Sequence, residues 1–382
     1  MTTLRPDLLL ADYRESSEGI EFGATTSAHG LYNTQQFVLR LSPLVHQRLA
    51  SVAPGIEAQS DFEIRQAMST YLHETIHWWQ HIGSTYGFIL GLNYPVQTHC
   101  THHDLLRLVQ GDGFKKSVLL QSSELGKKGP TRHGTPSGTA NIIVNNHFDL
   151  FAYRAITLGP DTAKRVIESN LFENVGHSFC LTYSHTISTL ASTVDPEFKV
   201  LPHPREWENA FKDLRSRKVR GYYYGSPINL YPIGAYEIFE GQASFSQMQF
   251  ISRTCACPPG WDAFKGIGML HGVYVLAFEA FLKYTESDWP SHAGSPLVSL
   301  FLLVCDLSIN PGSGFPFSVS PNFESFIGDV NPGARFILFC RLIANHFPHF
   351  KNSIIRHDRN EYEEITNQLC RRKRSRPTED RQ

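Results

Sequence analysis

An unbroken run of helix-forming residues near the start of the chain most constrains the fold. Residues 62–82 contain neither glycine nor proline, Ser60 or Asp61 can cap the amino end of a helix, and Gly83 can end it. At 3.6 residues per turn, the run predicts a helix of about six turns. The fold of the chain therefore has to include this long helix and provide an environment for its polar residues.

The predicted helix carries the sequence HETIH, residues 73–77. On a helix, His73 and His77 lie about 6 Å apart along the axis and about 40° apart around it, so both imidazoles project from one face. One tetrahedral Zn²⁺ with Zn–N bonds of about 2.0–2.1 Å can bind to both. Glu74 lies about 100° around from His73, where it can reach a water on that metal. We therefore expect zinc to lower the pKa of this water and Glu74 to take its proton as general base.

A catalytic zinc site needs a third protein ligand. His81 is about 12 Å along the helix from His73, too far to share the same metal, so we expect it to pack or to support the ligands. His99, His102 and His103 follow soon after, in a stretch expected to be irregular.

The favoured third ligand is Glu240, in AYEIFEGQAS (residues 235–244). It lies in a predicted helix among apolar and small residues, where a carboxylate needs a partner. Gly241 and Ala243 would let another helix approach closely. Glu237, one turn earlier, is either a rival ligand or an acceptor for a ligand histidine. A pair of carboxylates that meets Arg or Lys across the core is the non-metal alternative.

These two segments resemble the gluzincins, zinc metallopeptidases with two histidines from HExxH and a glutamate from a second helix. In several of them glycine follows this glutamate and alanine comes two residues later, as in Glu240-Gly241-Gln242-Ala243. The resemblance covers about a tenth of the chain. It implies that His73, His77 and Glu240 bind Zn²⁺ and that Glu74 serves amide hydrolysis. The about 160 residues between the two segments are many more than in typical members.

Composition excludes several classes of protein. The chain of 382 residues is 41% hydrophobic and 19% charged, with a formal net charge of −1. It can bury a sizeable core, and it has no charge bias toward nucleic acid or a membrane surface. The most apolar segments, Gly268–Leu282 and Leu297–Val304, are shorter than the about 20 residues of a membrane span. Seven cysteines without a framework and no signal-peptide pattern predict a cytoplasmic protein.

Helix signals recur along the rest of the chain, whereas β-like runs occur early, at Gly19–Gly23 and Phe37–Leu41. The further predicted helices are 162–172, 205–218, 233–250, 267–284, 297–308, 334–346 and 360–374. We predict a mainly α fold with a minor β part (α+β) and a zincin-like core. Residues 1–60 would form a β-containing segment packed on this core, and residues 61–350 the metallopeptidase domain with a large insertion between the two ligand helices. Residues 351–382 would form a C-terminal helix and basic tail.

The predicted function is zinc-dependent hydrolysis of a protein or peptide substrate, under controlled activation of the kind that a toxin or defence effector needs. Two alternatives stay open: a catalytically inactive zincin-like protein that binds a regulatory partner, and a zinc hydrolase of a non-peptide substrate. A peptidase also needs an electrophile for the oxyanion. His271, Tyr274 and the tyrosines of GYYYG (residues 221–225) are the candidates, among which the sequence does not select.

Overall fold

The computed structural model describes residues 30–34, 36–50, 62–113, 117–312, 314 and 323–374. This part of the chain is mainly helical. Its strands form a two-stranded antiparallel sheet of β1 (Gly30–Asn33) and β2 (Val38–Leu41), with Gly30 opposite Leu41. The expected mainly α fold with a minor β part is confirmed at this level.

The chain divides into two compact units. Unit 1 consists of residues 1–88, 232–310 and 332–382, and unit 2 of residues 89–231 and 311–331. The division of the sequence at residues 60 and 350 stays a prediction. Both segments that carry the predicted metal ligands belong to unit 1.

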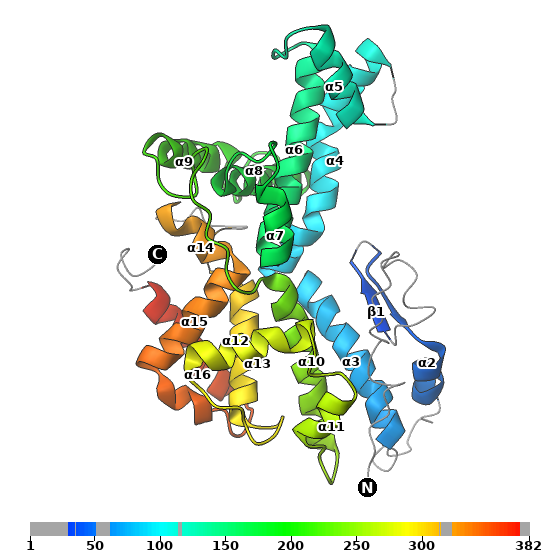
Figure 1. Ribbon diagram of the computed structural model, residues 1–382, viewed down its shortest axis with the longest axis vertical. Coiled ribbons are helices and arrows are strands. Elements are labelled where there is room, and N and C mark those ends of the chain that lie inside the picture. The colour runs from blue at the N-terminus through cyan, green and yellow to red at the C-terminus, as the bar shows by residue number, and fades with distance from the viewer. Residues whose placement is uncertain are drawn as a thin grey trace. The chain divides into compact units, whose positions relative to one another are not determined.

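Unit 1 contains the β1–β2 hairpin and a group of helices around α10 (Figure 1). These helices are α2 (Pro43–Ala50), α3 (Phe62–Ile82), α10 (Ala235–Thr254), α11 (Trp261–Gly266), α12 (Val273–Thr285), α13 (Pro296–Ile309), α15 (Pro332–His346) and α16 (Arg359–Arg374), with a 3₁₀ turn at Pro348–Asn352. The hairpin and α2 both pack on α3.

Helix α10 is central to unit 1 because it packs on α3, α12, α13 and α15. Its Phe245 packs against Phe278 of α12 with the rings tilted and their centroids 4.2 Å apart, and both rings contact Phe301 of α13. All three phenyl rings are fully buried. On the side toward α3 the packing is polar, since Gln247 donates to the hydroxyl of Ser69 at 3.2 Å. A helix buried on so many sides can hold a polar group away from bulk water.

Unit 2 contains most of α4 (Thr85–Asp112), which begins in unit 1. Its other helices are α5 (Val118–Lys128), α6 (Pro136–Leu158), α7 (Pro160–Ile167), α8 (Val175–Val194), α9 (Pro204–Ser216) and α14 (Phe326–Val330), with a 3₁₀ turn at Phe323–Ser325. Its core is aromatic: Tyr183 of α8 contacts Trp207 of α9 and Phe326 of α14 at centroid distances of 5.4 and 5.0 Å.

The predicted helices correspond to α7, α9, α10, α12, α13, α15 and α16, although α7 ends at Ile167 rather than 172 and α12 begins at Val273 rather than 267. The expectation of an irregular stretch at His99–His103 is wrong, because these residues lie within α4. Helix α4 continues through Pro95, and Gln97 bonds His147 of α6 at 2.7 Å. Packing here outweighs the local helix-breaking tendency of proline. The β-like run at Gly19–Gly23 and residues 375–382 of the basic tail lie outside the described residues.

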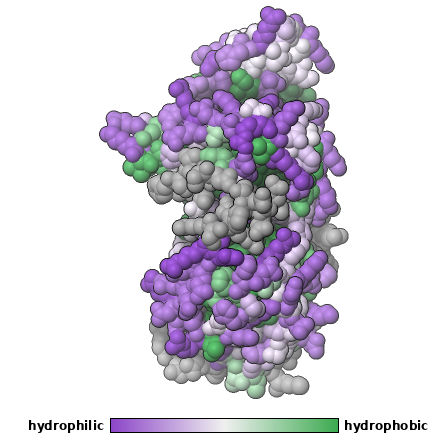
Figure 2. All heavy atoms as spheres, turned by 90° about the vertical axis from the view of Figure 1, so that its left-hand side faces the viewer, coloured by the Kyte–Doolittle hydropathy of each residue, from purple (hydrophilic) through white to green (hydrophobic). Residues whose placement is uncertain are grey.

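None of the described helices has the length and apolar character that crossing a bilayer requires. Hydrophilic side chains cover most of the described surface that is visible in Figure 2, and the apolar ones there occur in small separate groups.

Candidate metal centre

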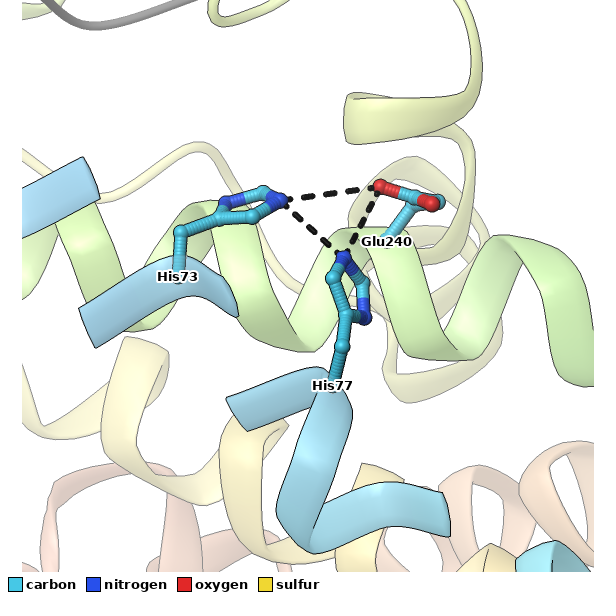
Figure 3. A group of neighbouring side chains, drawn as sticks. All are labelled: His73, His77 and Glu240. Atoms are coloured by element: carbon cyan, nitrogen blue, oxygen red, sulfur yellow. Dashed lines mark hydrogen bonds and ion pairs between the residues drawn. The ribbon is translucent and has the colours of Figure 1, made fainter. Parts of the chain in front are cut away.

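Helix α3 supplies two imidazoles on one face. Glu63 is an acidic residue in its first turn, which suits the positive end of the helix dipole. The helix ends where the N–H of Gly83 bonds the carbonyl of Trp79 at 2.7 Å. Between these points, His73 and His77 are one turn apart and both face α10 (Figure 3). His73 is 8% exposed, and His77 is partly exposed.

Helix α10 supplies a carboxylate. Its amino end is closed by Glu237, whose Oε2 accepts from the N–H of Gly234 at 2.7 Å. Of the two candidate glutamates, the structure thus gives Glu237 a capping role and places Glu240 with the histidines. A Cβ on Gly241 would lie 3.1 Å from the Cβ of Ala277, so the glycine lets α12 approach α10.

The three side chains converge on one point (Figure 3). His73 Nε2 and His77 Nε2 are 3.1 Å apart, and Glu240 Oε2 lies 3.8 Å from the first and 3.5 Å from the second. Donor atoms around a tetrahedral zinc ion with bonds of about 2.0–2.1 Å are separated by about 3.4 Å. Within the described chain, this is the group of histidine, cysteine and acidic side chains with the spacing to hold a metal ion. Both the spacing and the donor types fit zinc.

The electrostatics of the group favour a positive charge at that point. Burial acts to lower the pKa of His77, but the charge and hydrogen bond of Glu240 outweigh it and raise this pKa to about 9. For Glu240, burial acts to raise the pKa, and the two imidazoles overcome it and hold the pKa well below its usual range. Without a metal ion, a proton on an imidazole therefore balances the carboxylate.

Glu74 lies beside this group, under strand β1. It is 7% exposed, and burial raises its pKa against the opposing effect of His73 and His77. The backbone N–H of Tyr32 donates to its carboxylate. A Cβ on Gly30 would lie 2.6 Å from Glu74 Oε1, so β1 can approach this closely only with a glycine there. Strand β1 thus positions the predicted general base and covers it.

The other histidines of the first predicted site do not join the three donor atoms. His81 is buried on α3, where its Nδ1 is 2.9 Å from the hydroxyl of Tyr32 and its ring contacts Phe37. It supports the hairpin, as the packing interpretation expects. His99, His102 and His103 lie on α4 in unit 2.

Comparison with known proteins yields no relative, since no family model, curated protein or solved structure matches the chain.

The candidates for the electrophile occupy different places. The ring of Tyr274, in the first turn of α12, lies edge-on to the ring of His73 at a centroid distance of 6.3 Å. His271 is exposed, just before that helix. Tyr222 belongs to unit 2, where it is buried and its hydroxyl donates to the carbonyl of Phe323 at 2.8 Å. The structure thus brings Tyr274 to the candidate metal centre.

Two glutamines and the hairpin are parts of the site that sequence reasoning missed. Gln80 bonds the ring of His77, and Gln242 bonds Gln80. The position of Gln80, three residues after His77 on a helix, is the signal that could have identified it. The contact of Gly30 and Tyr32 with Glu74 has no such signal, because it depends on how the hairpin packs on α3.

Proposed function

We propose that this chain is a zinc-dependent metallopeptidase of the gluzincin type, which hydrolyses peptide bonds. One observation carries the proposal: two imidazoles of an HExxH helix and a carboxylate from a helix about 160 residues away converge within 3.8 Å. The adjacent Glu74 supplies the general base that such a reaction requires.

His73, His77 and Glu240 would hold the ion, a ligand set of two histidines and one carboxylate that leaves a position open. A bound zinc ion would supply Lewis acidity, which lowers the pKa of water and polarises a carbonyl group. Each ligand atom already faces the common point, so little rearrangement is needed to bind the metal.

Glu74 would take the proton from the attacking water and deliver it to the leaving amine. Burial raises the pKa of its carboxyl group, which brings it closer to that of a base at neutral pH. The bond from the backbone N–H of Tyr32 fixes the direction in which the carboxylate points. Tyr274 is the favoured electrophile, because its phenol ring lies next to His73.

A specific observation also supports the alternative of a silent or regulated site. Strand β1 covers Glu74, with no space for a side chain at Gly30. A protein of this kind would bind zinc and a partner without turnover. A zinc hydrolase of a non-peptide substrate would use the same ligands, and a substrate panel separates it from a peptidase.

The test is the metal content of purified proteins, measured by elemental mass spectrometry. We expect one zinc ion per chain in the wild type and in Glu237→Ala, and loss of zinc in His77→Ala and Glu240→Ala. Loss in Glu237→Ala with retention in Glu240→Ala would move the third ligand to Glu237. A wild type without zinc would contradict the proposal.

Turnover is tested with Glu74→Gln, which keeps the shape of the side chain and removes its basicity. We expect this variant to bind zinc normally and to hydrolyse a peptide library about 10²- to 10⁴-fold more slowly. If neither protein cleaves any peptide although zinc is bound, the peptidase proposal is wrong, and a panel of non-peptide substrates then separates a silent site from a different zinc hydrolase.

A further inference from the structure

Gln80 contacts both of the helices that carry the candidate metal ligands. It lies on α3, three residues after His77, and is 4% exposed. Its Oε1 is 2.8 Å from His77 Nδ1. Its Nε2 is 2.9 Å from the carbonyl oxygen of Phe239, the residue before Glu240 on α10. One side-chain amide thus joins a ligand histidine to the helical turn that carries the ligand carboxylate.

The orientation of this amide follows from its partners. The backbone carbonyl of Phe239 can only accept, so the NH₂ group of Gln80 must face α10. The Oε1 of Gln80 must then face His77 and accept a proton from Nδ1. A neutral His77 therefore carries its proton on Nδ1, and the lone pair on Nε2 points at Glu240. This is the tautomer that a metal ion needs from the ring.

Gln242 supports the same orientation from α10. Its Oε1 accepts the second N–H of Gln80 at 2.9 Å. Its own Nε2 lies 3.4 Å from the carbonyl oxygen of Leu302 on α13, to which it donates. Both ends of the Gln242 amide thus have partners, and reversing the Gln80 amide would place two acceptors against each other.

The other ligand histidine has no comparable support. His73 Nδ1 is buried and, within the residues that the structure describes, has no hydrogen-bond partner. Gln80 thus holds the Nδ1 side of the His77 ring by a hydrogen bond, whereas among the described residues no such bond holds the Nδ1 side of His73. The geometry of the site therefore depends on Gln80, although Gln80 is not itself one of the three residues that supply the donor atoms.

We propose that Gln80 is a positioning residue that sets the tautomer of His77 and holds it in register with Glu240. This inference rests on the metal site of the proposed function. Residues that bond metal-ligating histidines typically change metal affinity by about 10- to 100-fold when they are replaced. We expect Gln80→Leu to weaken zinc binding by that factor.

Zinc affinity is measured by competition with a chelator of known affinity. The matched control is Gln249→Leu, which removes a buried glutamine of α10 that donates to Ser299 at 2.8 Å. The control is expected to bind zinc as the wild type does. Gln80→Glu serves where Gln80→Leu folds poorly, because it keeps an acceptor for His77 Nδ1 but cannot donate to Phe239. We expect it to recover part of the affinity.

A spectroscopic readout separates positioning from a general loss of stability. In zinc-loaded protein labelled with ¹⁵N-histidine, the Nδ1-bound proton of His77 should be protected from exchange in the wild type, Gln80→Glu and Gln249→Leu. This protection from exchange should be lost in Gln80→Leu. Wild-type zinc affinity in Gln80→Leu, or an equal loss in Gln249→Leu, would overturn the positioning role alone. A wild type that binds no zinc would overturn the proposed function as well.

Discussion

At the scale of single residues, the candidate site combines groups whose charges depend on one another. His77 and Glu240 shift each other's pKa in opposite directions, so each favours the charged form of the other. Glu74 lies beside them, with a pKa that burial raises. Two carboxylates in one small volume thus have different environments, one bonded to imidazoles and one under a strand. This difference separates a ligand from a base.

Tyr274 offers a direct test of the electrophile. Tyr274→Phe removes the hydroxyl and keeps the ring that packs near His73. Removal of one oxyanion donor typically costs about 10²- to 10³-fold in kcat. We expect this loss with zinc content and KM nearly unchanged. Tyr222→Phe is the control, since Tyr222 is in unit 2 and should leave kcat unaltered. Unchanged kcat in Tyr274→Phe would exclude the role.

His185 of α8 predicts acid sensitivity in unit 2. Burial lowers its pKa to about 4, although Asp149 acts to raise it, and His177 also acts to lower it. In the unfolded chain His185 binds its proton near the ordinary pKa of about 6.5, so protonation does not favour unfolding above pH 6.5. As the pH falls from 6.5 to about 4, the unfolded chain binds a proton that the native protein does not. The free energy of unfolding therefore falls over this range, by about 3 kcal/mol.

Native-state hydrogen exchange of α8 at pH 7 and pH 4.5 measures this dependence. We expect His185→Gln to retain more of its protection at the lower pH than the wild type does, each relative to its own value at pH 7. An identical fall in both proteins would show that another group causes the acid sensitivity.

At the scale of elements, the hairpin and α3 form one structural feature. Strand β1 donates from Tyr32 to Glu74, and the hydroxyl of Tyr32 bonds His81. The helix was predictable from the absence of glycine and proline between residues 62 and 82. The contact of the hairpin with α3 was not predictable, because the sequence pattern of a four-residue strand does not indicate which element it packs against.

Gly30→Ala tests this contact. The added Cβ would lie 2.5 Å from Glu74 Cγ, so the strand or the carboxylate has to move. Overpacking of this kind costs about 1–3 kcal/mol. We expect lower thermal stability and slower peptide hydrolysis. Gly111→Ala is the control, since nothing lies within 4 Å of a Cβ there and α4 should be slightly stabilised. Equal activity in both variants would argue that the position of β1 does not influence Glu74.

At the scale of the whole molecule, the site belongs to one of two units. Helices α3 and α10 both lie in unit 1, although residues 89–231 separate them in the chain. A long intervening segment is thus compatible with a ligand pair that the sequence places far apart. The location of the site in unit 1 also predicts that zinc binding stabilises unit 1 more than unit 2.

Removal of zinc by a chelator should destabilise unit 1 selectively. At a free zinc concentration about 1,000 times the Kd, binding contributes about 4 kcal/mol to the native state. We expect the slowest-exchanging amides of α3 and α10 to lose up to about 1,000-fold in protection, while those of α6 and α8 change little. Hydrogen exchange with mass spectrometry measures both sets in one sample. An equal loss in both units would contradict a site confined to unit 1.

The sequence by itself determined the long α3 helix, the shared face of His73 and His77, and the choice of Glu240 over Glu237 as the favoured ligand. These are local properties: helix periodicity sets which side chains share a face, and a carboxylate among small apolar residues requires a partner. Only the tertiary structure decided that α10 faces α3, that β1 covers Glu74, and that Gln80 joins His77 to α10. Such contacts join residues up to about 160 positions apart, and their geometry depends on packing that no local pattern encodes.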